Sequence, residues 1–284
     1  MSPAFDLSAV ERAAAGRCLR LPRRPHRGRA GAVRASSAGS ALELHDFRGY
    51  HPGDDLRHVD WNAAARLGEL VVRVREDEVS PRVEVVLDAT ASMALTPTKV
   101  ARTLELAAWV LTLAGRGGLE AALVTVGREV SRVLGPWAPK ALGAAEFDGR
   151  EPFERCLERA VLRPCGLRVV VSDFLFDAAP QALAERLSRG AAGLALVQVL
   201  DVEDISPAGG GVRLVDSETG EVLERLLTEG VLEHYAARLR AHVDLWASAA
   251  RRVRASWAPV SAASSLEALA AGALAFLVDE GAGA

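Results

Sequence analysis

Hydrophobic and polar positions follow two alternating periods along the middle of the chain. Apolar runs with strand-like spacing give way to segments with apolar residues every three or four positions, and then the runs return. The strand-like runs cover residues 82–88, 119–127, 167–174 and 193–201, and the helical segments cover residues 98–115, 152–161 and 180–190. Strands that alternate with helices are typical of a mostly parallel sheet with helices on both faces. The pattern therefore predicts an α/β fold.

The alternation changes after Asp201. Residues 212–226 predict a hairpin that turns at Thr219–Gly220, and we treat the region near 205–227 as an insertion. A long helix, a short strand near 257–260 and a last helix over 264–278 complete the pattern. Because no linker separates two cores, we expect one domain over residues 82–278.

Residues 1–81 predict an N-terminal extension packed on that domain. A short helix over 7–16 precedes a segment rich in Arg, Pro, Gly and Ser, residues 17–40. This basic arm is expected to be a solvated segment laid over the core, and the alternative is an arm that binds anions or membranes.

Composition narrows the class of protein. Half of the 284 residues are hydrophobic, which is enough for a sizeable core. Lys and Arg number 34 against 37 Asp and Glu, so the charge does not favour a nucleic-acid partner. The three cysteines, Cys18, Cys156 and Cys165, form no CxxC pair and are expected to be free thiols. No apolar run approaches a membrane span and the N-terminus does not resemble a signal peptide, so we expect a cytoplasmic protein.

Acidic residues end two of the predicted strands. Asp88 ends one strand and is followed by the hydroxyls of Thr90 and Ser92, while Asp173 ends another. The carboxyl ends of parallel strands lie at one edge of a sheet, where ligands of such folds bind. Carboxylates and hydroxyls are hard oxygen donors for Mg²⁺ or Mn²⁺. The alternative is that Thr90 and Ser92 only cap the next helix.

Two enzyme classes also carry functional residues in a loop at a strand end, but the loop after Asp88 lacks the residues that they require. A haloacid-dehalogenase-type phosphatase needs a second acid where Thr90 stands. A nucleotide-binding loop needs a glycine-rich turn, and "DATASMALTPTK" contains no glycine.

The segment "YHPGDDLRHVDWNAAAR", residues 50–66, contains a Gly-Asp-Asp tripeptide like that of polymerase palm domains. The mixed, polar residues after it do not form the second hydrophobic strand of a palm. We expect a structural clasp in which aspartates pair with arginines and the Trp61 ring is buried, with a partner interface as the alternative. Its residues are Arg48, Tyr50, Gly53, Asp54, Asp55, Arg57, Asp60, Trp61 and Arg66. Three histidines nearby, His45, His51 and His58, are too irregularly spaced for a convincing zinc site.

The motifs of this chain resemble those of two protein families. "DATASM" together with "VVVSDF" resembles the metal-ion-dependent adhesion site of a von Willebrand factor A domain. The segment 46–73, "DFRGYHPGDDLRHVDWNAAARLGELVVR", closely resembles the signature of the bacterial family of unknown function number fifty-eight. The resemblance implies a von Willebrand A-like, Rossmann-like sheet and a metal site of Asp88, Thr90, Ser92 and Asp173.

The chain departs from the adhesion-site pattern at the second loop. Glu151 stands about where the family has a threonine, next to Arg150. Glu151 is therefore a further metal ligand, or Arg150 takes the place of the cation.

The resemblance implies a function as well as a fold. It indicates a non-enzymatic protein-interaction module that works with a MoxR-type AAA+ ATPase or its client protein, with Mg²⁺ or Mn²⁺ if the site is complete. The alternative is a metal-dependent hydrolase that uses Asp88 and Asp173, for which Glu151 and Asp177 are the candidate general bases.

Overall fold

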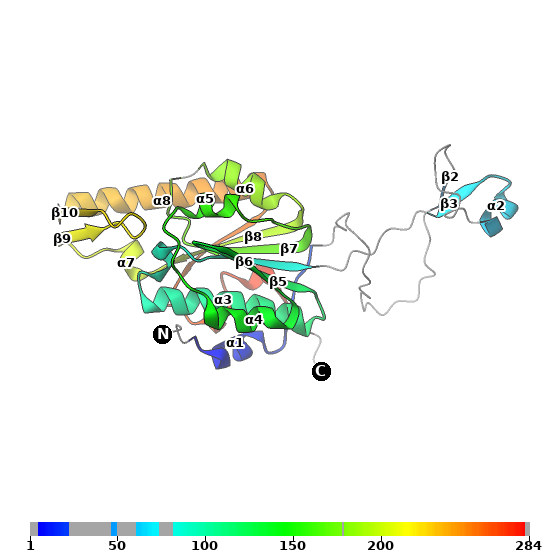
Figure 1. The fold of residues 1–284 in the computed structure, drawn as a ribbon, viewed down its shortest axis with the longest axis horizontal. Coiled ribbons are helices and arrows are strands. Elements are labelled where there is room, and N and C mark those ends of the chain that lie inside the picture. Colours follow the sequence, from blue (N-terminus) through cyan, green and yellow to red (C-terminus); the bar gives the residue numbers. More distant parts are fainter. Residues whose placement is uncertain (1–4, 23–46, 50–60, 74–81, 178, 282–284) are drawn as a thin grey trace. The chain divides into compact units, whose positions relative to one another are not determined.

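The computed structural model describes residues 5–22, 47–49, 61–73, 82–177 and 179–281. The chain divides into two compact units, one of residues 1–26 and 81–284 and the other of residues 27–80. The larger unit contains the central sheet and both acidic strand ends (Figure 1).

The larger unit is built on a six-stranded sheet with the order β11-β8-β7-β4-β5-β6. All neighbouring strands are parallel except the edge strand β6, which is antiparallel to β5. The strands are β4 (Val83–Asp88), β5 (Ala121–Val126), β6 (Val130–Leu134), β7 (Cys165–Ser172), β8 (Ala191–Leu200) and β11 (Ser256–Ser261). This confirms the predicted mostly parallel α/β sheet.

Helices cover both faces of this sheet (Figure 1). Successive residues of a strand point to opposite faces, so Val85 and Leu87 pack in one core cluster and Val86 in the other. The first face is covered by α1 (Leu7–Ala14), α3 (Pro97–Arg116), α4 (Ala138–Ala141) and α9 (Leu266–Ala271). The second face is covered by α5 (Phe153–Glu158), α6 (Pro180–Ser188) and α8 (Glu229–Arg252).

The helix α3 follows the first acidic strand end, and its start is fixed locally. Thr96 is the N-cap and its hydroxyl accepts a hydrogen bond from the backbone N–H of Lys99. Pro97 occupies the first turn, where no backbone donor is needed. The first turn therefore holds Lys99 at a fixed place beside the strand ends, and Lys99 is fully buried.

The two ends of the larger unit are joined. The helix α1 packs on α3 and α9, and β1 (Arg17–Leu19) pairs antiparallel with β12 (Val278–Glu280). The predicted last helix over 264–278 is shorter than expected. It ends before Gly272 and is followed by a 3₁₀ turn and β12, because glycine is a poor helix former and favours helix termini.

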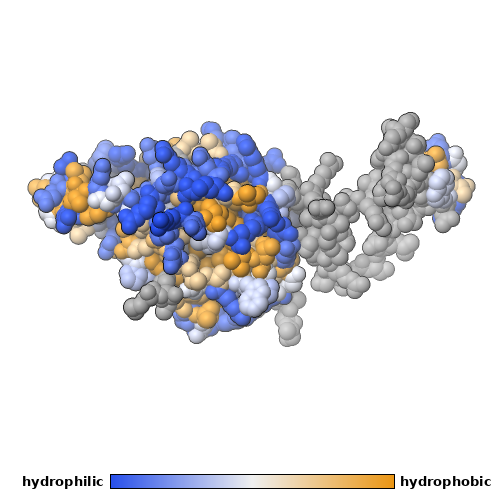
Figure 2. Space-filling view, viewed as in Figure 1, coloured by the Kyte–Doolittle hydropathy of each residue, from blue (hydrophilic) through white to orange (hydrophobic). Residues whose placement is uncertain are grey.

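The predicted hairpin is present and projects with α8 at one end of the unit (Figure 1). Its strands β9 (Gly210–Val215) and β10 (Val222–Leu227) follow the short helix α7 (Val202–Ile205), and among the described residues they pair only with each other. No residue of either strand is buried, and hydrophobic side chains show between polar ones at this end in Figure 2. The long helix α8 is buried only in its second half, at Trp246, Ala249 and Ala250.

The smaller unit holds part of the expected clasp. Strand β2 (Phe47–Gly49) pairs antiparallel with β3 (Val71–Arg73), and α2 spans Trp61–Leu67. The side chain of Trp61 is 62% exposed, whereas we expected a buried ring. Residues 50–60, which contain Tyr50, Gly53, Asp54, Asp55, Arg57 and Asp60, lie outside the described residues.

Candidate functional site

Asp88 and Asp173 lie at the same edge of the sheet, as the alternation predicted. Asp88 is the last residue of β4, Asp173 directly follows β7, and the two strands are parallel neighbours. The chain crosses from β4 to β5 on one side and later from β7 to β8 on the other, so these strands flank the point where the winding reverses. Ligands of open α/β sheets bind beyond the carboxyl ends of strands at such a point.

Protein donors surround the buried Asp88 carboxylate. Oδ1 accepts hydrogen bonds from the backbone N–H of Thr90 at 2.9 Å and from its hydroxyl at 2.7 Å. Oδ2 accepts from the hydroxyl of Ser172 at 2.5 Å, and the hydroxyls of Thr90 and Ser92 are 3.0 Å apart. Burial, with repulsion from Asp173, raises the pKa of Asp88 to about 7 despite these donors.

Asp173 is paired with a lysine that the sequence did not point out. The Lys99 ammonium lies 2.9 Å from Oδ2 of Asp173 and 3.0 Å from Oδ2 of Asp204. Oδ1 of Asp173 accepts from the backbone N–H of Leu175, and its backbone carbonyl accepts from the buried Gln198 amide. Burial acts to lower the pKa of Lys99, but the two carboxylates outweigh it and raise this pKa above its usual value.

Asp201 and Asp204 bring a third strand end into the network. They form the capping box of α7, directly after β8: the backbone N–H of Asp201 donates to Asp204 and the Asp201 side chain accepts from Val202. The hydroxyl of Thr96 donates to Asp201. Lys99 in α3 and the N-cap residue Thr96 therefore connect the loops that follow β4, β7 and β8. We call this part of the sheet edge, with its three loops, the strand-end edge.

The second-loop residues lie beside this edge but make other contacts. The backbone of Gly149 pairs with the Thr90 loop, and Ala91 donates to its carbonyl at 2.9 Å. The Glu151 carboxylate forms an ion pair with Arg159, and both side chains are exposed. A hollow of about 430 Å³ is lined here by Arg128, Asp148, Arg150, Glu151 and Arg159, and we call it the arginine hollow.

The possible metal ligands at the strand-end edge do not fit the cation site that the resemblance implied. All four carboxylate oxygens of Asp88 and Asp173 already accept hydrogen bonds from protein groups. Glu151 is engaged with Arg159, and no hydroxyl residue stands at positions 149–151. In the part of the chain that the structure describes, no three His, Cys, Asp or Glu side chains are grouped so that they could hold a metal ion.

Exposed apolar side chains surround the same edge. Leu95 precedes Thr96 and is 54% exposed, and Leu175 follows the Asp173 loop and is 37% exposed. Val202 and Ile205 on α7 are 57% and 45% exposed. These four residues, which we call the apolar rim, belong to the loops that Lys99 and Thr96 connect.

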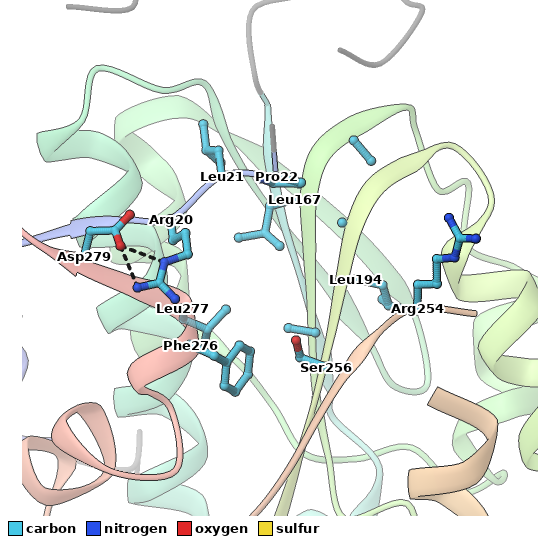
Figure 3. A pocket seen from close by; sticks show the side chains of 13 residues that line it. Arg20, Leu21, Pro22, Leu167, Leu194, Arg254, Ser256, Phe276, Leu277 and Asp279 are labelled. Carbon is cyan, nitrogen blue, oxygen red and sulfur yellow. Dashed lines mark hydrogen bonds and ion pairs between the residues drawn. The ribbon is translucent and has the colours of Figure 1, made fainter. Parts of the chain in front are cut away.

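Another hollow of the larger unit lies away from this edge (Figure 3). It measures about 600 Å³ and is lined at the beginnings of β7, β8 and β11 by residues such as Leu167, Leu194 and Ser256. Arg20 at its wall is paired with Asp279 at 2.6 Å. Because it opens at the amino ends of the strands, it is separate from the strand-end edge.

Sequence reasoning found the two acids and two hydroxyls but missed Lys99, Ser172, Gln198 and Asp204. The one available signal was in "VVVSDF" and "DVED", where polar residues accompany an acidic strand end. Lys99 gave no signal, because a lysine in the first turn of an amphipathic helix is usually solvated.

The comparison with protein families identifies the chain. Residues 46–244 match the family described as protein of unknown function DUF58, and the chain belongs to this family. Uncharacterized proteins of Mycobacterium tuberculosis and Mycobacterium bovis are each 27% identical over 243 residues, which cover 78% of this chain and 74% of each relative.

Two solved structures are weakly similar to this chain. The crystal structure of an aerotolerance-related membrane protein from Bacteroides fragilis is 12% identical, with a TM-score of 0.37 over 69% of this chain and 97% of its own. An uncharacterized membrane-spanning protein from Vibrio fischeri is 13% identical, with a TM-score of 0.17 over 63% of this chain and 91% of its own. Both of these proteins are described as membrane proteins, and we withdraw the expectation of a cytoplasmic location. Within the described residues, no helix is long and apolar enough to cross a membrane.

Proposed function

We propose that this DUF58 chain is a non-enzymatic protein-interaction module of the von Willebrand A type, with the strand-end edge as its docking face. The observation that carries the proposal is the connected set of loops at this edge. Lys99 joins Asp173 to Asp204, and Thr96 joins the first loop to Asp201. Buried ion pairs and hydrogen bonds hold the loops in place, while the apolar rim stays exposed on them.

The chemistry of this face favours a partner segment that is both apolar and acidic. The apolar rim offers hydrophobic area to bury, and such patches commonly mark interaction sites. Arg128 and Arg150 are exposed in the adjacent arginine hollow. Arginine binds carboxylates through paired N–H donors, so Arg150 is placed to receive a carboxylate of the partner.

A MoxR-type AAA+ ATPase, or a client that it remodels, is the partner that we propose from the family resemblance. Such an ATPase would supply the energy for remodelling, and this chain would supply the docking face. The contacts of the candidate bases support this choice over a metal-dependent hydrolase. The Glu151 carboxylate is paired with Arg159, and Asp177 is exposed. Neither residue is therefore held beside Asp88 and Asp173, where a general base would have to act.

Capture of a purified MoxR-type ATPase from the same genome tests this proposal. We expect the wild-type chain to retain the ATPase, and Val202→Ser in the apolar rim to weaken the capture. Val161→Ser is the matched control, because Val161 is 75% exposed and precedes β7, at the other end of the strands. Equal capture by both variants would place the docking face elsewhere.

A further inference from the structure

We infer that Lys99 is the resident cation of the strand-end edge, so that the site keeps its structure without a divalent metal. The inference rests on the proposed docking face and concerns what holds it together. Lys99 is fully buried, and its ammonium contacts Asp173 and Asp204 at 2.9 and 3.0 Å.

The placement of the ammonium explains why a metal is not needed. A buried carboxylate requires a compensating charge or several hydrogen-bond donors. Asp173 receives the Lys99 ammonium and the backbone N–H of Leu175, while Asp88 receives three donors from Thr90 and Ser172. Both carboxylates are therefore satisfied by groups of the chain itself.

The same placement opposes a second cation. A divalent ion bound by Asp173 would share this carboxylate with the ammonium, and like charges that meet in a buried site repel strongly. Of the other groups in the implied site, Thr90 and Ser92 are neutral hydroxyls, which hold a divalent ion less firmly than carboxylates do. Both oxygens of the Asp88 carboxylate already accept hydrogen bonds from Thr90 and Ser172. Because Glu151 is paired with Arg159, it adds no charge to offset this loss.

Lys99 also reaches a carboxylate outside the implied metal site, that of Asp204. Its contacts extend from the loop after β7 to Asp204 on α7, from which the hairpin and α8 follow along the chain. The hydroxyl of Tyr235 on α8 donates to the backbone carbonyl of Asp204 at 2.6 Å. Through Asp204, the Lys99 ammonium thus connects the docking face with α8, which projects from the unit together with the hairpin.

Titration calorimetry of the EDTA-treated full chain with Mg²⁺ and with Mn²⁺ tests the inference directly. We expect no saturable heat that depends on the site. Ser92→Ala assigns any heat that is seen, since Ser92 is only partly buried and its loss leaves the carboxylates paired. A saturable heat in the wild type that Ser92→Ala abolishes would overturn the inference.

Thermal unfolding supplies the second arm. The melting temperature of the wild type should be the same in EDTA and in excess Mn²⁺, whereas Lys99→Met should melt lower in EDTA and recover in part with Mn²⁺. The double variant Lys99→Met, Asp173→Asn should show no such recovery. An equal melting temperature of Lys99→Met in both conditions would contradict the exchange of ammonium for metal.

If Lys99→Met does not fold, the calorimetric titrations of the wild type and of Ser92→Ala still test the inference. No partner takes part in either experiment, so a negative result leaves the docking proposal standing.

Discussion

The Lys99 ammonium lies 2.9 Å from Oδ2 of Asp173, and both side chains are buried. The pair joins the first turn of α3 to the loop after β7, and its second contact with Asp204 reaches the loop after β8. Lys99 thus supplies the positive charge that Asp173 and Asp204 need in a buried environment, and it holds the three loops of the strand-end edge together.

Removal of this ammonium should destabilise the fold. Lys99→Met leaves Asp173 and Asp204 without their charge partner, and loss of one member of a buried pair costs roughly 3–5 kcal/mol. Urea unfolding measures the free energy of unfolding, and the exposed Lys140→Met is the control with a change of less than about 1 kcal/mol. A loss for Lys99→Met no larger than that of the control would mean that the pair contributes no net stability.

Stability should decline with pH because of Asp88. Its pKa is about 7 in the folded protein against an ordinary value of 3.8, so between these values the folded chain holds a proton that the unfolded chain has released. The contribution is complete below about pH 4 and lost as the pH rises through about 7, with a slope of at most ~1.4 kcal/mol per pH unit.

The variant Asp88→Asn cannot titrate and should flatten this decline. Urea unfolding of both proteins in a series of buffers between about pH 4 and 8 measures the slopes. Parallel curves for wild type and variant would show that Asp88 titrates in its ordinary range.

A second buried ion cluster should matter for stability at the other end of the strands. Glu84 lies near the start of the central strand β4, where its carboxylate contacts Arg168 at 2.6 Å and Arg132 at 2.7 Å. Glu84→Ala leaves the fully buried Arg168 uncompensated and should cost roughly 3–5 kcal/mol in urea unfolding. Glu120→Ala breaks the partly exposed pair with Arg82 and should cost about 1 kcal/mol or less. Similar losses for the two variants would contradict this account.

The projecting hairpin should be dispensable for folding. No residue of β9 or β10 is buried, and in the part of the chain that the structure describes these strands pair only with each other. Replacing residues 210–227 by a short Gly/Ser linker should therefore lower the melting temperature by only a few degrees, since exposed segments contribute little burial. A cooperative transition lost altogether would show that the hairpin is part of the folding unit.

Local patterns explain why the sheet and the acidic edge could be predicted from the sequence. The strands β4, β5, β7 and β8 are apolar runs of suitable length, and an acid at the end of such a run has its place fixed by the parallel order of strands. The edge strand β6, whose residues are mixed and not buried, gave no such pattern. Asp88 and Asp173 could therefore be assigned to one edge without any knowledge of side-chain contacts.

The chemistry of that edge depends on contacts that no local pattern encodes. Lys99 meets Asp173, which lies 74 residues later in the chain, and in the sequence it looks like an ordinary solvated residue of a helical first turn. Glu151 stands at the expected ligand position, but its partner Arg159 only becomes evident from the fold of the loop and α5. The exposed Trp61 likewise shows that a tryptophan in a charged segment need not be buried within its own unit.

The affinity for a MoxR-type AAA+ ATPase, measured for the wild type and for Arg150→Glu, tests the proposed docking face most directly. Arg150→Glu reverses the charge in the arginine hollow, and Arg240→Glu makes the same change at an exposed position on α8. We predict that Arg150→Glu weakens binding at least about tenfold, roughly 1.4 kcal/mol, while Arg240→Glu binds as the wild type does. Equal dissociation constants for the two variants, or no binding by the wild type, would contradict the account.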